Sequence, residues 1–346
     1  EGFGLPIVES LDYGKPCICA NFGAMAEAAA GGGCLAVDVR DAGTIERAIA
    51  TLTGNLNELS KLEREVVARK SVTWSDYTKD FCTLMDRATV PKNKIGKIFY
   101  WVDQTCVFPS NTGIQRVVRG LARALIESDI DLIPVKWDIT AGFFVSPTNS
   151  ELSHLAQWNG PAVDDWTNWG DAITFEPSDW LFIPEVISAP SGPSITTISA
   201  VARSRGLLVA SIFFDAIPWK MQDIYPPEAT KAHGNYMCAL NDSDLVFSIS
   251  ESSNADLLEF LRLQPLLHTP NLFERLRAAL LPGEFRETPR NTKIKPACET
   301  VRILCVGTVE PRKNHLTLLK AFAKVQKQAP RGKRVELTIV GIAPFP

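Results

Sequence analysis

The sequence lacks several features that would assign it quickly to a class of protein. No stretch approaches the roughly 18 consecutive apolar residues of a membrane-spanning helix. Its 36 lysine and arginine residues against 39 aspartate and glutamate residues give a net charge of -3, so no general attraction to nucleic acid is expected. The eight cysteines include no C-x-x-C pair and no matched histidine spacing, which argues against a zinc site or a disulfide framework. The cysteines are therefore predicted to be reduced thiols of a cytoplasmic protein.

What is present is the composition of an ordinary globular protein of two or three domains, with 346 residues, 45% hydrophobic and 22% charged. Short apolar strands alternate with helical stretches, which predicts an α/β fold with parallel sheets. Two polar stretches that contain proline divide the chain: TVPKNKIG and PGEFRETPRNTKIKPACET. We therefore expect four segments, at 1–89, 90–96 (a linker), 97–299 (ending in a hinge) and 300–346.

The apolar pattern also places individual elements. In the first segment we expect strands Pro16–Ala20 and Leu35–Asp38 and helices Ala42–Leu52 and Leu56–Arg69. In the third we expect a helix from Thr112 to Glu127 and strands at Lys97–Asp103, Leu132–Trp137, Trp180–Pro184, Leu207–Phe214 and Leu245–Ile249. The last segment should contain strand Val301–Gly307, helix His315–Gln328 and strand Val335–Gly341.

The opening string, EGFGLPIVE, is the first candidate site. Gly2 and Gly4 remove side chains from the backbone between Glu1 and Glu9, and Pro6 stands where a first helical turn begins. These features predict a helix N-terminus whose free N–H groups can bind a phosphate, with two carboxylates beside it for hydroxyl groups. The alternative is a plain helix start with two solvated glutamates.

The string GTVEPRKNHLTLL is the second candidate site. A strand ends at Gly307 and Thr308, and the loop that follows presents Arg312 and Lys313 before a helix begins. This is the position at which α/β sheets bind ligands. Two adjacent cations suit a diphosphate and can neutralise a leaving pyrophosphate without a metal ion. The alternative is a solvated basic turn.

The string PSNTGIQRVVRG is the third candidate. Gly113 opens a helix after a strand and could let a substrate lie against the backbone, although an ordinary strand-to-helix turn uses glycine too. On the same helix, Arg116, Arg119 and Arg123 lie near one face. We interpret that face as solvated in preference to a helix lying on a membrane surface.

Two D-x-D strings, Asp129–Asp131 and Asp242–Asp244, imitate the motif of metal-dependent transferases. The first follows the end of a helix and the second lies in a polar turn, so we interpret both as turn chemistry. No metal site and no cofactor are predicted. The histidines His154, His233 and His268 show no partner pattern.

Four strings together resemble a known family: EGFGLPIVESLDYGKPCICANFGAMAEAAAGG, SIFFDAIPWKMQDIYPPE, DLVFSISESSNADLLEFL and ILCVGTVEPRKNHLTLLKAFA. They are similar to retaining nucleotide-sugar glycosyltransferases of family four, which have the GT-B fold of two Rossmann-like lobes. The resemblance covers nearly the whole chain, but the order differs from that of the family. It implies that 1–89 corresponds to the second half of a donor-binding C-terminal lobe, 97–299 to an acceptor-side N-terminal lobe, and 300–346 to the first β-α-β of another C-terminal lobe.

That order leads us to interpret the chain as an internal fragment of a tandem two-transferase polypeptide. Its C-terminal-type lobe is then incomplete and split between the two chain ends. We expect these ends to pack into one incomplete sheet, because each end alone would leave apolar edges uncovered. Since the resemblance assigns base recognition to a part of the lobe outside this sequence, the fragment itself is expected to be inactive.

The resemblance also implies a role for particular residues. Glu1 corresponds to the glutamate near the reacting carbon of the donor sugar, and Glu9 to the one on the nucleotide ribose. Phe3, Gly4 and Leu5 correspond to positions whose backbone amides face the sugar and phosphate.

The other donor residues lie in the later strings. Arg312 and Lys313 correspond to the diphosphate-binding pair, after the strand end at Gly307 and Thr308, and Gly113 corresponds to the loop beneath the donor. Asp215 corresponds to the aspartate of a catalytic His-Asp pair. Phe214, however, stands where that pair would have its histidine, so histidine-assisted catalysis is in doubt.

The activity implied is metal-independent hexosyl transfer with retention at the anomeric carbon, through stabilisation of the leaving nucleoside diphosphate. By analogy the donor is GDP-mannose, a substrate and not a cofactor. The acceptor is a glycan or lipid-linked glycan in bacterial surface polysaccharide or lipopolysaccharide synthesis. The resemblance implies that this transfer takes place in the cytoplasm and that the enzyme associates peripherally with the inner membrane. The alternative is a degenerate GT-B module with a binding or scaffolding role in a glycan-synthesis assembly.

Overall fold

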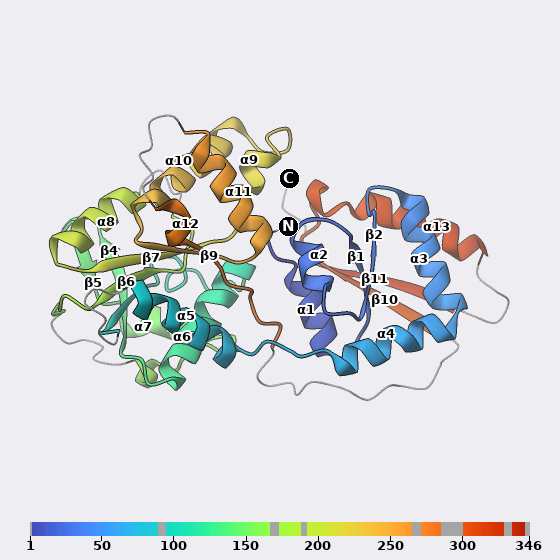
Figure 1. Cartoon of the computed structure of the whole chain (residues 1–346), viewed down its shortest axis with the longest axis horizontal. Helices are drawn as coiled ribbons and strands as arrows, with labels where there is room; N and C mark the ends of the chain where they lie inside the picture. Colours follow the sequence, from blue (N-terminus) through green and yellow to red (C-terminus); the bar gives the residue numbers. More distant parts are fainter. Residues whose placement is uncertain are drawn as a thin grey trace. The chain divides into compact units, whose positions relative to one another are not determined.

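The computed structural model describes residues 2–88, 95–166, 173–187, 192–264, 271–284, 300–328 and 334–342. Its contacts divide the chain into two compact units (Figure 1). Unit 1 combines Phe3–Val72 with Pro282–Pro346, and unit 2 contains Gly2 and Thr73–Leu281. Strands and helices occur in both units, so the predicted α/β class is confirmed.

Unit 2 is built on a seven-stranded sheet in the order β5-β4-β3-β6-β7-β8-β9. The strands are β3 (Ile98–Trp101), β4 (Leu132–Asp138), β5 (Phe143–Val145), β6 (Trp180–Ile183), β7 (Leu208–Phe213), β8 (Leu245–Ser248) and β9 (Leu276–Ala278). All neighbours are parallel except β5, which pairs antiparallel with β4. The short strands and their continuous burial are typical of a parallel sheet covered on both faces.

Helices cover both faces of this sheet. They are α5 (Trp74–Ala88), α6 (Gly113–Glu127), α7 (Asn149–Leu155), α8 (Ile195–Ser204), α9 (Ile217–Lys220), α10 (Pro227–Ala239), α11 (Glu251–Arg262) and α12 (Leu272–Arg275), with short 3-10 turns η1 (Val163–Asp165) and η2 (Leu240–Asp242). Alternate strand residues point to opposite faces. Phe99 and Leu181 therefore join the cluster under α8, α10 and α11, whereas Phe182 packs on Phe81 of α5, with ring centroids 4.7 Å apart.

The strand order places a switch point at β3. Its two neighbours are β4, reached through α6, and β6, reached only after β5 and α7. The loops that leave the carboxyl ends of β3 and β6 therefore turn to opposite sides of the sheet. In α/β sheets this divergence creates a crevice in which ligands bind.

Unit 1 contains two parallel strand pairs. The strands are β1 (Cys17–Ala20) with β2 (Cys34–Val37), and β10 (Thr300–Val306) with β11 (Arg334–Val340). The helices are α1 (Leu5–Asp12), α2 (Gly23–Ala29), α3 (Ala42–Gly54), α4 (Leu56–Ala68) and α13 (His315–Gln328), and a 3-10 turn η3 (Pro311–Lys313) precedes α13.

The two ends of the chain pack together in unit 1 through helices. Ile45 and Ile49 of α3 form one buried cluster with Ala321 and Val325 of α13, and Val335 of β11 completes it. Figure 1 shows α3 and α13 side by side in this unit. Among the described strands, however, the pairs β1-β2 and β10-β11 form two separate sheets, so the expected single sheet is not found. Helix packing joins the two pairs, and no backbone hydrogen bond links them among the residues that the structure describes.

The segment boundary near residue 89 differs from the boundary between the units. Helix α5 belongs to unit 2, because Phe81 and Met85 are fully buried there and Trp74 packs against Gly120 of α6. Of the expected linker, 90–94 lies outside the described residues. Ile95 is buried and its N–H donates to Asp86, so the end of that segment is part of the packed unit.

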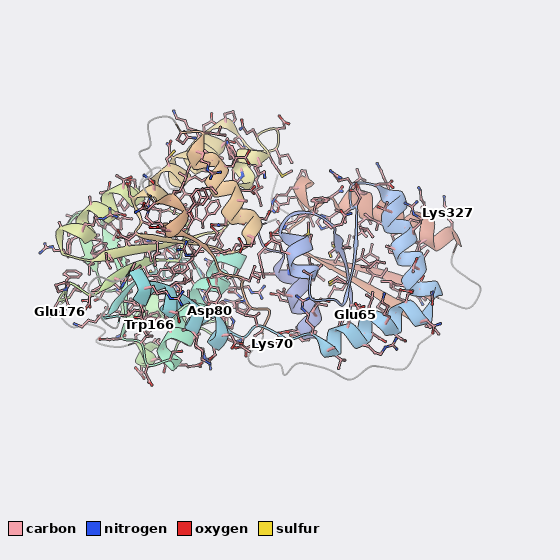
Figure 2. All side chains as sticks on the ribbon, in the orientation of Figure 1. Glu65, Lys70, Asp80, Trp166, Glu176 and Lys327 are labelled. Carbon is pink, nitrogen blue, oxygen red and sulfur yellow. The ribbon has the colours of Figure 1, made fainter. Side chains whose placement is uncertain are left out.

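Buried side chains fill both units (Figure 2). Trp166, labelled there, lies 6.2 Å from Tyr100 between ring centroids in unit 2, and Glu65 of α4 accepts a hydrogen bond from the Gly33 N–H in unit 1. Within the described parts of the chain, no helix has the length and apolar character needed to cross a membrane.

Candidate functional site

The carboxyl edge of the unit 1 strands gathers the N-termini of several helices. Strand β1 leads directly into α2, β2 into α3, and β10 into η3 and α13. The first helix also starts at this edge. A Cβ built on Gly4, which precedes α1, would lie 3.3 Å from Cγ of Met25 in the first turn of α2. Parallel strands thus bring the loops after β1 and β2 to one edge, and the turn at Gly4 lies beside the start of α2.

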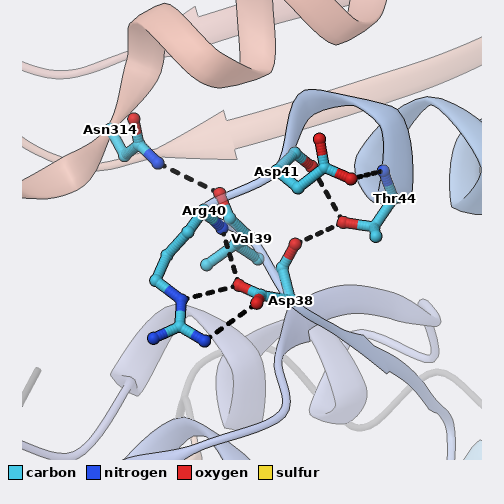
Figure 3. A network of polar contacts seen from close by, with 6 residues as sticks. All are labelled: Asp38, Val39, Arg40, Asp41, Thr44 and Asn314. Atoms are coloured by element: carbon cyan, nitrogen blue, oxygen red, sulfur yellow. Dashed lines mark hydrogen bonds and ion pairs between the residues drawn. The ribbon is translucent and has the colours of Figure 1, made fainter.

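The loop that carries the basic pair is tied to the same edge. The Asn314 amide donates a hydrogen bond of 3.0 Å to the carbonyl of Val39, which lies just after β2 (Figure 3). Asn314 adopts a left-handed conformation with φ 54°, which ends η3 and starts α13. This bond therefore joins the carboxyl ends of β10 and β2, from opposite ends of the chain.

The start of α1 has the features of an anion site. Gly4 has φ 95° and ψ 45°, a left-handed conformation that favours glycine, and it supplies no side-chain cap to the helix. Its carbonyl accepts the Ile7 N–H at 2.9 Å, while Pro6 in the first turn has no N–H to offer. Phe3 is buried at 4% exposure and anchors the turn. The Leu5 amide at the start of the helix is the group we assign to a phosphate.

The basic pair lies on η3 and is partly buried. Arg312 forms an ion pair of 2.6 Å with Glu310, and both side chains are about one-fifth exposed. The Lys313 side chain runs alongside Gly307, since its Cδ would lie 3.9 Å from a Cβ at that position. Its charge also reaches β10: burial raises the pKa of Cys305 and Lys313 opposes that rise. Lys313 is thus held against the end of β10, and Arg312 is held beside it by Glu310.

Glycine is required where the ends of β10 and β11 meet. The Gly307 N–H donates to Val340 at 2.9 Å, and a Cβ on Gly341 would lie only 1.9 Å from the Gly307 carbonyl oxygen. The next residue, Thr308, is exposed. The backbone of Gly307 is therefore used in pairing with β11, and the exposed Thr308 follows it beside the cations.

The loop between β2 and α3 carries its own ion pair at this edge (Figure 3). Arg40 donates from Nε and Nη2 to both carboxylate oxygens of Asp38, each at 2.8 Å, and its guanidinium lies 4.9 Å from the Phe22 ring centroid. The hydrogen bond from Arg40 lowers the pKa of Asp38 to about 2. Asp41 caps α3 through the amides of Gly43 and Thr44, so that helix start is already occupied by a carboxylate.

Unit 1 thus contains Phe3, Gly4, Leu5, Glu9, Gly307, Thr308, Arg312 and Lys313 of the predicted site. Glu9 is half-buried on the second turn of α1. Glu1 lies outside the described residues. Gly113 and Asp215 belong to unit 2.

The two candidate residues of unit 2 have local structural roles. Gly113 is the exposed first residue of α6, after a capping box made by Thr112 and Gln115. Asp215 Oδ1 accepts the Ile217 N–H at 3.0 Å, and its backbone oxygen lies 2.9 Å from Nε2 of His233. Burial lowers the pKa of His233, and the hydrogen bond and charge of Asp215 oppose this shift. No sequence signal links these two residues, which α9 and the start of α10 separate.

Sequence reasoning missed Glu185 at the switch point. Its carboxylate is 1% exposed and accepts the amides of Gln104 at 2.9 Å and Thr105 at 2.7 Å, together with the Thr105 hydroxyl. Burial raises the pKa of Glu185 to about 7, although these hydrogen bonds favour the charged form and oppose the rise. The carboxylate ties the loop after β3 to the end of β6. The only sign of this buried carboxylate in the sequence was a glutamate that follows an apolar strand.

The prediction of a solvated arginine face on α6 is wrong for Arg119. That side chain is 1% exposed, and it donates to the carbonyls of Ser110 and His154 and to the Asn111 side chain. It therefore joins α6 to the preceding loop and to α7. A buried arginine is tolerated here because these backbone and amide oxygens accept its hydrogen bonds.

The second D-x-D string, Asp242–Asp244, contacts other elements of unit 2 and is not confined to its own turn. Asp242 accepts from the Thr196 hydroxyl, and Asp244 accepts the Val209 amide and pairs with Arg203. Among the residues that the structure describes, no three acidic, histidine or cysteine side chains are grouped as a metal site. No family model matches the chain, and no curated protein matches it either. The functional argument therefore depends on the motifs and on the geometry of the unit 1 edge.

Proposed function

We propose that the protein is a nucleotide-sugar glycosyltransferase of the retaining, GT-B type, and that the carboxyl edge of unit 1 binds the diphosphate of the donor. The observation that supports this proposal most strongly is the Asn314–Val39 hydrogen bond, which holds the Arg312–Lys313 turn at the strand edge where α1 also begins. A basic pair and a helix start without a side-chain cap are two anion-binding features of different kinds.

The chemistry that suits this edge is departure of a nucleoside diphosphate. Negative charge develops on the leaving phosphate as the bond to the anomeric carbon breaks. Arg312 offers a planar fork of donors and Lys313 a compact charge, so together they can stabilise that charge. The Leu5 amide and the dipole of α1 would add to this stabilisation. Glu9 is assigned to the ribose hydroxyls.

We extend the proposal to substrates by analogy with the family that the motifs resemble. The donor is then GDP-mannose, and the acceptor is a glycan or lipid-linked glycan of a bacterial surface polysaccharide. Unit 2 is then the acceptor-side lobe, in which Gly113 corresponds to the family's loop beneath the donor and Asp215 to the aspartate of its catalytic His-Asp pair. Two Rossmann-like lobes account for both units, and the enzyme would act in the cytoplasm or at the inner membrane.

The proposal is tested by titrating the chain with GDP, UDP and GDP-mannose in a calorimeter. We expect at least one of the nucleoside diphosphates to bind. The double variant Arg312→Ala/Lys313→Ala should weaken that binding by more than about tenfold, because two charge-assisted contacts are lost.

The matched control is Lys320→Ala/Lys327→Ala, which removes two exposed cations from α13 and changes the net charge equally. Binding should be unaffected in the control. Equal weakening in both double variants would indicate general charge attraction and contradict the assigned site. No binding of any nucleoside diphosphate by the wild-type chain would contradict the proposal itself.

One observation favours the alternative of a binding or scaffolding module. Phe214, next to Asp215, is buried at 6% exposure and provides no proton-transfer group at the position that the family gives to histidine. The module would bind the nucleoside diphosphate without transferring sugar. Mass spectrometry that detects products formed from GDP-mannose and a glycan acceptor would contradict the binding module. Absence of product would agree with both functions, because this chain by itself is expected to be inactive.

A further inference from the structure

Three cysteines lie on one face of the β1-β2 sheet. Cys17 and Cys19 point to the same face, because alternate residues of a strand do so, and Cys34 is the direct register partner of Cys17. The Cys34 thiol forms hydrogen bonds with both of the others. All three belong to the apolar cluster formed with Ile7, Leu11 and Val66 of α1 and α4. Each is a free thiol in the structure.

Strand geometry selects one pair from the three. Neighbouring strands lie about 4.8 Å apart, which falls within the roughly 4.4–6.8 Å between Cα atoms that disulfides require. Cys17 and Cys34 are direct partners and meet this condition. Cys19 lies two residues further along β1, so strand spacing and rise in this parallel pair put its Cα about 8 Å from that of Cys34, which a disulfide does not span without backbone movement.

Accessibility selects the same pair. Cys17 and Cys34 are half-buried, whereas Cys19 is 5% exposed. The entry to β2 is also fixed: Gly32 and Gly33 have φ 87° and 80°, and Glu65 accepts the Gly33 N–H at 3.0 Å. Cys34 is therefore held opposite Cys17, and both residues of this pair are partly exposed.

We propose that Cys17 and Cys34 form an oxidisable thiol pair, which closes to an intramolecular disulfide by exchange with a small disulfide such as oxidised glutathione. Among the described residues no three-ligand metal group is present, and a two-thiol pair suits disulfide exchange. The site is independent of the proposed transferase activity.

The exchange proceeds in two steps. The Cys34 thiolate attacks one sulfur of oxidised glutathione and breaks its S–S bond, releasing one glutathione thiolate, which takes up a proton, and leaving a mixed disulfide. Cys17 then loses its proton and attacks the Cys34 sulfur, which releases the second glutathione. Two protein thiols are oxidised, and one glutathione disulfide is reduced to two thiols.

The hydrogen bond with Cys34 lowers the pKa of Cys19, but Cys19 is nearly fully buried and is not part of the selected pair. Within the pair, Cys34 is assigned as the first nucleophile because its environment resists ionisation less than that of Cys17. The hydrogen bond from Cys17 lowers the pKa of Cys34, but the bond to Cys19 and burial outweigh it and raise the pKa to about 12. The hydrogen bond with Cys34 and burial raise the pKa of Cys17 further. Only a small fraction is thiolate at neutral pH, so the reaction should accelerate about tenfold per pH unit under alkaline conditions.

The test is to treat the folded chain with oxidised glutathione, count free thiols and map disulfides by mass spectrometry. We expect two thiols to be lost and a peptide containing Cys17 to be linked to one containing Cys34, with reversal by dithiothreitol. The disulfide is mapped in the wild-type chain, so the main result does not depend on whether a variant folds. The variant Cys19→Ser should still form the link, and so should Cys82→Ser, the control for a half-buried thiol elsewhere.

Other outcomes would overturn the proposal. A link that involves Cys19, or mixed disulfides with glutathione that never close, would contradict the selected pair. So would a Cys17–Cys34 link that appears only after the chain is unfolded. A rate that does not rise with pH would contradict attack by a thiolate with a raised pKa.

Discussion

At the scale of single residues, the ionisable carboxylate of Glu185 accepts the hydrogen bonds that hold the loop after β3. Its carboxylate is buried at the switch point of unit 2 and accepts hydrogen bonds from Gln104 and Thr105 in the loop after β3. Burial raises its pKa to about 7 from a usual value of 4.5. The folded state therefore disfavours the charged form, while the unfolded chain does not.

This shift predicts a pH dependence of stability. The contribution of Glu185 is fully present below its unfolded pKa of 4.5 and is lost as pH rises through about 7. The shift corresponds to about 3 kcal/mol as an upper order of magnitude. Glu185→Gln cannot ionise, so its melting temperature should rise relative to that of the wild type by several degrees between acidic and mildly alkaline pH.

Differential scanning fluorimetry across that pH range is the measurement. The substitution also alters the hydrogen bonds to Thr105, which changes the melting temperature by the same amount at every pH. The prediction therefore concerns only how the difference in melting temperature between Glu185→Gln and the wild type changes with pH. A constant difference would mean that Glu185 does not titrate in the folded state in this range.

At the scale of elements, α6 packs closely against α5 because Gly120 of α6 has no side chain. A Cβ on Gly120 would lie 2.5 Å from the Trp74 ring, closer than real contacts permit. Gly234 of α10 is the opposite case, since its nearest neighbour, Phe260, would be 3.9 Å away. Two glycines inside helices thus differ only in what faces them.

The two glycine-to-alanine substitutions should therefore change stability in opposite directions. Gly234→Ala should stabilise the protein by about 0.5–1 kcal/mol, because alanine favours the helix and restricts the unfolded chain. Gly120→Ala should destabilise it by about 1–3 kcal/mol, because overpacking displaces Trp74. Urea unfolding measures both. Equal effects would contradict the close contact between α5 and α6.

The sequence predicted elements well where patterns were strong. Strands β4, β6, β7, β8, β10 and β11 and helices α6 and α13 all lie within one or two residues of their predicted bounds. Helices α8, α10 and α11 were not predicted: α10 has mixed residues on all sides and gains its buried face only from Tyr236 and Met237 against the sheet. The short edge strands β5 and β9 carry no pattern of their own and form by pairing with β4 and β8.

The site was predictable only in part, for a similar reason. Local motifs identified the α1 start and the Arg312–Lys313 turn, because glycine, proline and paired cations act through neighbouring backbone. The Arg119 anchors and the Glu185 hydrogen bonds join residues far apart in sequence, so no spacing rule reveals them. The contact of His233 with Asp215 likewise depends on how α10 packs.

At the scale of the whole molecule, unit 1 is assembled from both ends of the chain. Ala321 of α13 is 0% exposed and lies in one cluster with Ile45 and Ile49 of α3. A charge placed there is buried without a partner, which destabilises a packed interface strongly.

We expect Ala321→Glu to lower hydrogen-exchange protection in α3, which is far away in the sequence, and to leave the helices of unit 2 unchanged. Exchange followed by mass spectrometry of peptides covering α3, α8 and α10 measures this. Lys320→Glu, at the exposed neighbouring position, is the control. The amides of α3 in that variant should exchange as slowly as they do in the wild type. Unchanged protection of α3 in Ala321→Glu would contradict assembly of unit 1 from both ends.

The most direct test of the central claim, that the carboxyl edge of unit 1 binds a nucleoside diphosphate, is amide chemical-shift mapping by NMR. Adding GDP or UDP to the isotopically labelled chain should shift the amides of Leu5, Gly307, Thr308 and Lys313. Gly142 and Gly206, in turns of unit 2 with open space around them, should not move. Saturable shifts confined to those four amides and their neighbours are the predicted result, whereas saturable shifts that leave Gly307 and Lys313 unmoved would contradict the account.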